Sequence, residues 1–137
     1  MYYTIELTTK QRTELVDITK KIEEIIRKSN TKSGIAIIYV PHTTAAVTIN
    51  ENYDPSVIAD INETLNRLVP HHFHYNHTEG NADAHIKAAI IGSSRIVFYE
   101  HNQIQFGTWQ GIFFCEFDGP RKRKVFVKIL PDPEENK

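Results

Sequence analysis

The first third of the chain carries an alternating pattern followed by a helical one. Apolar and polar residues alternate over residues 3–7, which predicts a strand with one buried face. Apolar residues then recur at spacings of three and four, namely Leu15, Ile18, Ile22, Ile25 and Ile26. With charged residues between them, this spacing predicts an amphipathic helix that ends before Gly34.

Two strands and a second helix are predicted next. Residues 34–40 form a continuous apolar run that is typical of a buried strand, and residues 43–50 alternate as a second strand would. Asp54-Pro55 predicts a helix start, because Asp is a good N-cap and Pro is favoured at the first helical position. The apolar stripe of this helix runs to Leu68.

The second half of the chain is predicted to hold one short helix and four strands. Asn81 can cap a helix that runs to Gly92. The strands are expected at residues 95–99, 103–106, 107–118 and 124–130. This order predicts an α+β fold with mostly antiparallel strands. We expect a single domain over residues 1–130 and a polar C-terminal tail over 131–137.

Composition excludes several classes of partner. The formal net charge is -1, from 16 basic and 17 acidic residues, so nothing draws the chain generally to nucleic acid or to an anionic membrane. No apolar run reaches membrane-spanning length. The single Cys115 cannot form an internal disulfide. Together these features predict a soluble, cytoplasmic protein.

Histidine is unusually concentrated in one stretch. Five of the seven histidines fall between residues 71 and 85. His77 lies in a loop, His85 lies in the first turns of a helix, and His42 follows a proline at a strand end. Three imidazoles around one cation would leave an open position, which suits a catalytic zinc or a similar metal. The predicted metal ligands are His42, His77 and His85, and the remaining loop histidines are expected to be exposed.

The strand over residues 107–118 combines an aromatic face with a polar one. Gln110, Glu116 and Asp118 share a face because alternate residues of a strand point the same way. The carboxylates could bind a cation, orient a base or pair with Arg121. An ion pair that only stabilises the following turn is the alternative.

Two further features have both a functional and a structural interpretation. The basic run RKRK begins at Arg121, whose fork suits phosphate oxygens, although a solvated strand start also explains it. Asp60 lies on the second helix, where a solvent-facing position is the alternative to a catalytic one. Asn50 precedes that helix and could shape the same cleft.

Three segments carry a family resemblance: PHTTAAVTINENYDPSVIADI, HTEGNADAHIKAAIIGSS and FGTWQGIFFCEFDGPRKR. They resemble the signature blocks of the YjbQ family (UPF0047), whose members are often labelled secondary thiamine-phosphate synthases. The resemblance implies an α+β sandwich of about seven strands with two to three helices. It also implies a homotrimer.

The resemblance assigns roles to residues of this chain. The implied catalytic residues are Glu116, Asp118, Arg121, Gln110 and Asp60. The implied substrate-binding residues are Trp109, Asn50, Asn81, Thr43 and Arg121. In this interpretation Arg121 and a divalent cation neutralise a departing pyrophosphate, and Trp109 stacks on a heteroaromatic ring.

The function implied is a transferase that joins hydroxymethylpyrimidine diphosphate to thiazole phosphate and releases pyrophosphate. A histidine-rich site suits zinc better than the magnesium that usually supports pyrophosphate release. One alternative is therefore a metal-dependent hydrolase of a small phosphorylated or amide substrate. Another is a non-catalytic trimeric protein that binds a metal or a ligand.

Overall fold

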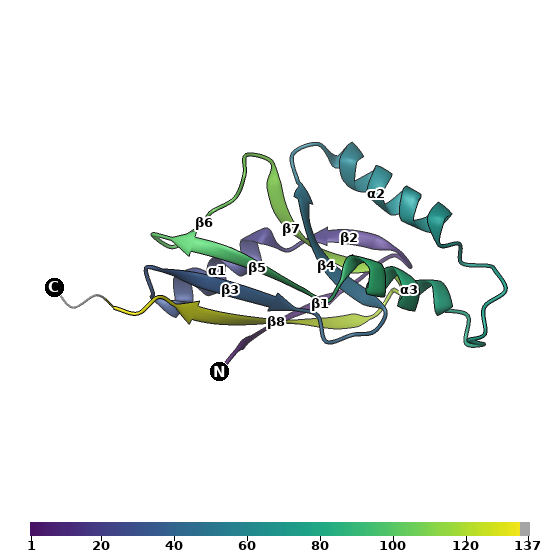
Figure 1. Ribbon diagram of the computed structural model, residues 1–137, viewed down its shortest axis with the longest axis horizontal. Helices are drawn as coiled ribbons and strands as arrows, with labels where there is room; N and C mark the ends of the chain where they lie inside the picture. The colour runs from purple at the N-terminus through teal and green to yellow at the C-terminus, as the bar shows by residue number, and fades with distance from the viewer. Residues whose placement is uncertain (135–137) are drawn as a thin grey trace.

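The computed structural model describes residues 1–134 as two antiparallel sheets with three helices (Figure 1). The strands are β1 (Tyr3–Thr8), β2 (Glu14–Asp17), β3 (Ser33–Tyr39), β4 (Ala45–Glu51), β5 (Ser94–Glu100), β6 (Gln103–Ile104), β7 (Gln110–Glu116) and β8 (Lys122–Pro131). The helices are α1 (Thr19–Ser29), α2 (Pro55–Leu68) and α3 (Ala82–Ile91). One sheet has the order β1-β8-β3-β5-β6 and the other has the order β2-β7-β4. The predicted α+β class is confirmed.

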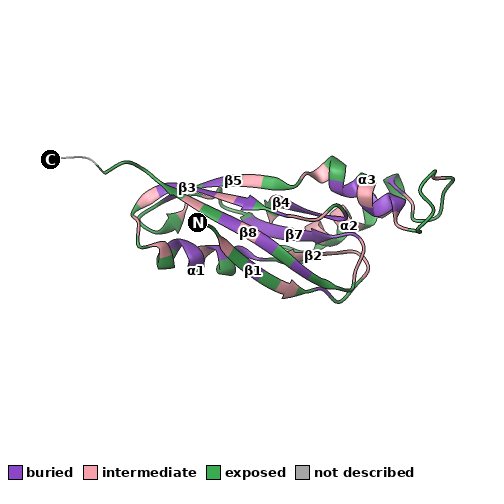
Figure 2. Ribbon diagram, turned by 90° about the horizontal axis from the view of Figure 1, so that it is seen from below, coloured by how far each residue is buried: buried purple, intermediate pink, exposed green. Residues whose placement is uncertain are grey.

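The small sheet is the middle layer of the molecule. One of its faces packs with α1 against the large sheet, in a core that includes Ile22, Ile38, Phe114 and Val127. Its other face is covered by α2 and α3, over a second cluster that includes Phe117. Figure 2 shows the purple, buried positions concentrated between these layers.

Strand β7 is buried on both faces, whereas one aromatic and one polar face were predicted for it. A polar face was expected on this strand, but all residues from Gly111 to Phe117 are buried. The reason is the position of β7 at the centre of the small sheet, with the large sheet below and two helices above. Glu116 therefore lies inside the protein instead of on an open strand face.

The first predicted helix begins later than expected. Leu15 belongs to β2, which pairs with β7, and α1 starts only at Thr19. The Asp17 carboxylate accepts hydrogen bonds from the Thr19 amide and hydroxyl at 2.9 and 2.6 Å. A strand of four residues, three of them half-buried, is too short to show alternation, so the helical spacing of Leu15 and Ile18 led to the wrong prediction.

The other two helices begin where the sequence predicts. Asp54 caps α2 by accepting from the Ser56 amide at 2.9 Å, with Pro55 at the first position. Asn81 occupies the N-cap position of α3, but its side chain makes no capping hydrogen bond. The Asn81 side-chain amide donates instead to Asp118 Oδ2 at 2.9 Å.

The predicted C-terminal tail starts within the large sheet. Pro131 is the last residue of β8, and the Asp132 amide donates to Ser33 O at 2.9 Å. Residues 135–137 of that tail lie outside the described residues. None of the helices formed by residues 1–134 is long and apolar enough to cross a membrane.

Candidate functional site

The predicted site residues lie at two opposite ends of the β4–β7 pair. These strands run antiparallel, with Glu51 opposite Gln110 at one end. Because a strand rises about 3.3 Å per residue, the two ends of β7, Gln110 and Glu116, are separated by roughly 20 Å, with Trp109 beyond one end and Asp118 beyond the other. Within one chain the residues therefore form two groups, one around Asp118 and one around Trp109.

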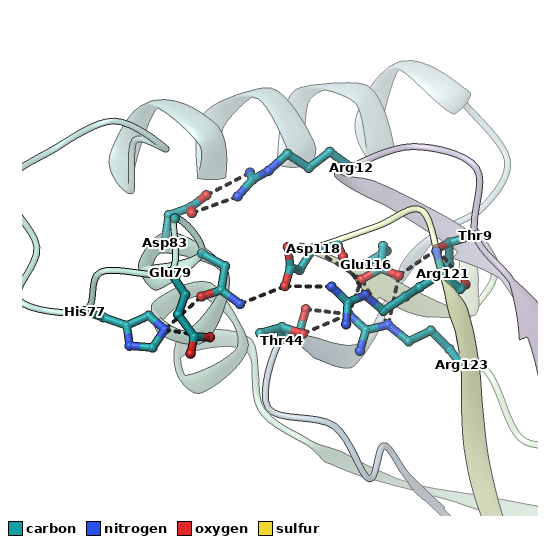
Figure 3. Close-up of polar contacts among 12 residues, drawn as sticks. Thr9, Arg12, Thr44, His77, Glu79, Asp83, Glu116, Asp118, Arg121 and Arg123 are labelled. Atoms are coloured by element: carbon teal, nitrogen blue, oxygen red, sulfur yellow. Dashed lines mark hydrogen bonds and ion pairs between the residues drawn. The ribbon is translucent and has the colours of Figure 1, made fainter.

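A buried ion pair underlies the group around Asp118 (Figure 3). Glu116 accepts from Arg123 Nε at 2.9 and 3.1 Å and also pairs with Arg123 Nη2. Thr9 Oγ1 donates to Glu116 at 2.7 Å, and the Asp118 amide donates at 3.1 Å. Burial alone would raise the pKa of Glu116, but these hydrogen bonds together lower it below its usual value. Glu116 can therefore act on a ligand only through the groups that it positions.

The exposed rim of this group is a chain of four side chains (Figure 3). Asp118 Oδ2 accepts from Arg121 Nη2 at 3.1 Å and from Asn81 Nδ2 at 2.9 Å. Arg121 Nε also donates to Asp118 O at 2.8 Å. The Asn81 side-chain oxygen lies 2.9 Å from His77 Nε2. Residues 77, 81, 118 and 121, all predicted for the site, are thus connected.

The hydrogen-bond chain fixes the tautomer of His77. The Asp118 carboxylate only accepts, so the nitrogen of the Asn81 amide must face it and the amide oxygen must face His77. Nε2 of His77 then carries a hydrogen, which leaves Nδ1 to accept a proton. The side chain of His77 is 43% exposed, so a ligand can reach that nitrogen.

The turn beneath this rim tolerates only glycine at residue 119. A Cβ on Gly119 would lie 2.3 Å from Gln11 O, 2.8 Å from Glu116 Cγ and 2.8 Å from Thr9 Oγ1. The Gly119 amide also donates to Arg12 O at 2.9 Å. This close approach holds the turn that carries Asp118 and Arg121 against the loop between β1 and β2.

The three predicted metal ligands are not brought together. The rings of His77 and His85 meet edge to face with centroids 5.3 Å apart, and Glu79 lies 3.7 Å from His77 Nε2. His42 Nε2 instead accepts from the Lys124 amide at 3.0 Å. Among residues 1–134, no group of three or more His, Cys, Asp or Glu side chains is placed to hold a metal ion. A three-histidine site is therefore not assembled within one chain.

His42 borders a basic cleft at the start of β8. The cleft has a volume of about 650 Å³, and its lining includes Lys21, Lys122, Arg123 and Lys124, with Glu6 as its acidic residue. Burial, followed by the charge of Arg123, lowers the pKa of His42, so this imidazole is neutral at pH 7. The cleft is suited to an anionic ligand.

A buried charge cluster that the sequence analysis missed supports α3. Asp83 accepts two hydrogen bonds of 3.0 Å from Arg12 and one of 3.2 Å from Lys87. Lys87 also donates to Asn66 on α2 at 2.6 Å. Asp83 and Lys87 are four residues apart on one helix, and that spacing was the only signal available. Arg123 was missed too, although its alternation with Val125 and Val127 places it on the inner face.

At the opposite end of β7, Trp109 and Tyr53 border a second cleft. Their ring centroids are 5.1 Å apart and the ring planes are tilted by 56°. The cleft has a volume of about 560 Å³, and its other lining residues are Glu51, Asp54 and Pro55. Trp109 therefore cannot stack on a ligand that is held by Arg121 of the same chain.

The remaining predicted residues have separate surroundings. Gln110 Oε1 accepts from the Gly107 amide at 2.9 Å, and Asn50 Oδ1 accepts from the next backbone amide at 2.8 Å. Asp60 lies on an exposed part of α2 beside Val57, Ile61, Thr64 and Leu65. Thr43 is exposed in the turn between β3 and β4.

Comparison with known proteins gives consistent matches over nearly the whole chain. The family model described as UPF0047 protein YjbQ-like matches residues 3–132. UPF0047 protein MJ1081 of Methanocaldococcus jannaschii is 52% identical, with 96% of each chain covered. UPF0047 protein YugU of Bacillus subtilis is 44% identical, with 95% of this chain and 99% of that one covered. A solved YjbQ/UPF0047 structure from Clostridium acetobutylicum has a TM-score of 0.92 at 46% identity, over 93% of this chain and 99% of that one. None of these names states an activity.

Proposed function

Because this chain belongs to the UPF0047 (YjbQ-like) family, we propose that it is a transferase of the thiamine-phosphate synthase type. It joins hydroxymethylpyrimidine diphosphate to thiazole phosphate and releases pyrophosphate. The observation that carries the proposal is the rim at Asp118, where a fixed guanidinium and a proton-carrying imidazole are linked by hydrogen bonds. The neighbouring basic cleft supports a phosphorylated substrate.

Arg121 is the residue that we assign to the leaving group. In the reaction the bond between the methylene carbon and the diphosphate oxygen breaks, and its electron pair leaves with pyrophosphate. The thiazole nitrogen supplies the pair for the new C–N bond. Negative charge grows on the leaving group, so a guanidinium held in place by Asp118 stabilises the transition state. Half of the Arg121 side chain is exposed and can contact the diphosphate.

His77 is the residue that we assign to proton transfer. With Nε2 committed to Asn81, the protonated ring has Nδ1–H free to donate to the departing pyrophosphate. A resident metal is not included in this scheme, because the histidines do not converge within the described chain.

A metal-dependent hydrolase is the second candidate. It is favoured by the contact between His77 and His85, with Glu79 beside them. These three side chains could contribute to a divalent cation site if substrate or a second chain supplied further ligands. A protein that only binds a metal or ligand would share the same residues without turnover.

The test is formation of thiamine phosphate by purified wild-type protein and by Arg121→Ala. We expect Arg121→Ala to lower kcat/KM by about 100-fold, the usual cost of removing one transition-state donor. Lys28→Ala is the matched control, since Lys28 is an exposed cation near the end of α1 and away from both the rim and the large sheet's outer face, and it should keep full activity.

Three results would count against parts of the proposal. If wild-type protein forms no thiamine phosphate in the presence of magnesium or zinc, the synthase proposal is refuted. Equal loss of activity in Arg121→Ala and Lys28→Ala would refute a specific role of Arg121. Hydrolysis of phosphate esters that disappears on chelation, without synthase activity, would favour the second candidate.

A further inference from the structure

We propose that the cleft between Tyr53 and Trp109 binds a small organic cation with a quaternary or N-alkylated aromatic nitrogen. Both rings are open to solvent, with Tyr53 76% and Trp109 53% exposed. Their tilted arrangement, with centroids 5.1 Å apart, presents two ring surfaces to one space. Large aromatic side chains are seldom left this open together unless a partner or ligand covers them.

The chemistry of the lining selects a positive ligand. A ring face attracts cations through its quadrupole, and tryptophan does so most strongly. Glu51 and Asp54 add two carboxylates to the same lining. The positive end of α2 also points here, but it offsets only about half a charge, so the cleft stays negative.

The carboxylate of Asp54 remains charged at neutral pH. Hydrogen bonds from the Ser56 backbone amide and from its side chain lower the pKa of Asp54 below its usual value. Asp54 Oδ1 accepts the Ser56 amide at 2.9 Å, which fixes the carboxylate at the start of α2.

The loop that carries Tyr53 is held in position before any ligand arrives. The Asn52 amide donates to Trp109 O at 3.0 Å, which ties the loop directly to β7. The Asn52 side chain donates to Asp17 at 3.3 Å. It also packs where a Cβ on Gly111 would come within 2.4 Å, so only glycine admits this arrangement. A preorganised loop lowers the entropic cost of binding.

This cleft is independent of the proposed synthase site. Trp109 and Asp118 lie beyond opposite ends of β7, which are roughly 20 Å apart, so one small ligand cannot contact both within a chain. Loss of cation binding would therefore leave the synthase proposal untouched. Loss of synthase activity in Arg121→Ala would likewise leave this cleft intact.

Intrinsic fluorescence tests the inference directly, because Trp109 is the only tryptophan of the chain. Choline is the probe, and 3,3-dimethyl-1-butanol is its neutral isostere. Choline should shift the emission of Trp109 in a saturable way, and the neutral alcohol should bind at least about threefold more weakly. Equal binding of the two probes, or no saturable shift with choline, would overturn the proposal.

Three variants test separately how the two carboxylates and the aromatic ring of Tyr53 contribute to choline binding. The double variant E51Q/D54N keeps both local acceptors, since Gln and Asn oxygens still accept the amides of residues 54 and 56. It should weaken choline binding by about threefold to tenfold with an unchanged melting temperature. Tyr53→Leu should weaken binding similarly, whereas Tyr53→Phe should not. Wild-type affinity in both E51Q/D54N and Tyr53→Leu would refute the assignment.

Discussion

At the scale of single residues, Cys115 reports how completely β7 is enclosed. It is 1% exposed, and burial raises the pKa of its thiol to about 12 despite the opposing charge of Arg95. The thiolate is the reactive form, so at pH 8 almost none is present. We expect native protein to resist a disulfide reagent such as DTNB, and denatured protein to react with one equivalent.

Rapid reaction of the native protein would contradict this description of β7. A Phe73→Ala variant provides a control, because Phe73 is 69% exposed in the histidine-rich loop and far from the β7 core in sequence. It should leave the thiol equally protected.

Local rules predicted some residues well and others not at all. Asp54 was recognised as a cap because capping depends on neighbours two residues away. Asn81 has the same local signature, yet its amide bonds to Asp118, a partner 37 residues distant. Arg123 pairs with Glu116 through burial that only the assembled layers create. Residue roles were therefore predictable where the partner is near in sequence.

At the scale of elements, the position of α3 depends on the Asp83 cluster. Arg12 and Lys87 hold this carboxylate, and α3 in turn presents Asn81 to the site. Burial alone would raise the pKa of Asp83, but hydrogen bonds from Arg12 and Lys87 lower it below its ordinary 3.8. The folded state therefore gains stability from Asp83 above pH 3.8 and loses it as pH falls through the lowered value.

Substitution of this cluster should show strong coupling. Asp83→Asn should lower the free energy of unfolding by about 3 kcal/mol, because it leaves the buried ammonium of Lys87 without its carboxylate. Lys87→Met should cost less, since Asp83 keeps Arg12. The double variant should be more stable than the two single losses would predict. Urea unfolding at pH 7 and pH 2.5 measures these values.

Two outcomes would contradict the role of the cluster. Additive losses in the double variant would mean that Asp83 and Lys87 do not act together. An equal fall in stability between pH 7 and pH 2.5 for wild type and Asp83→Asn would mean that Asp83 contributes nothing to acid unfolding.

The elements also show where sequence patterns stop being informative. Helix α2 was predicted because its cap and apolar stripe agree. The strand β2 was missed because its four residues, three of them half-buried, are too few to show a period of two. The sequence motif places Trp109 and Asp118 in one short segment, so both were assigned to one site. The extended strand between them keeps their side chains apart.

At the scale of the whole molecule, the outer face of the large sheet carries a group of exposed apolar side chains, with Lys128 among them. Strand register places Phe98 opposite Ile35, and Ile35 opposite Leu130. Ile96 and Phe98 are 56% and 65% exposed, and Tyr39 and Leu130 belong to the same surface. Figure 2 shows buried and exposed positions alternating along these strands. A contiguous apolar sheet face of this kind marks an interaction surface.

We propose that this face assembles the chain into the homotrimer implied by the family resemblance. Light scattering on wild-type protein should give three times the 15.8 kDa of one chain. Phe98→Lys should shift the particle toward monomer, because it places a charge at the centre of the apolar face. The control is Phe73→Lys, since Phe73 is equally exposed but lies in the loop between α2 and α3. A monomeric wild type, or a trimer that survives Phe98→Lys, would show that this face does not join the chains. If Phe98→Lys dissociates the particle and also abolishes synthase activity, the proposed synthase site needs more than one chain.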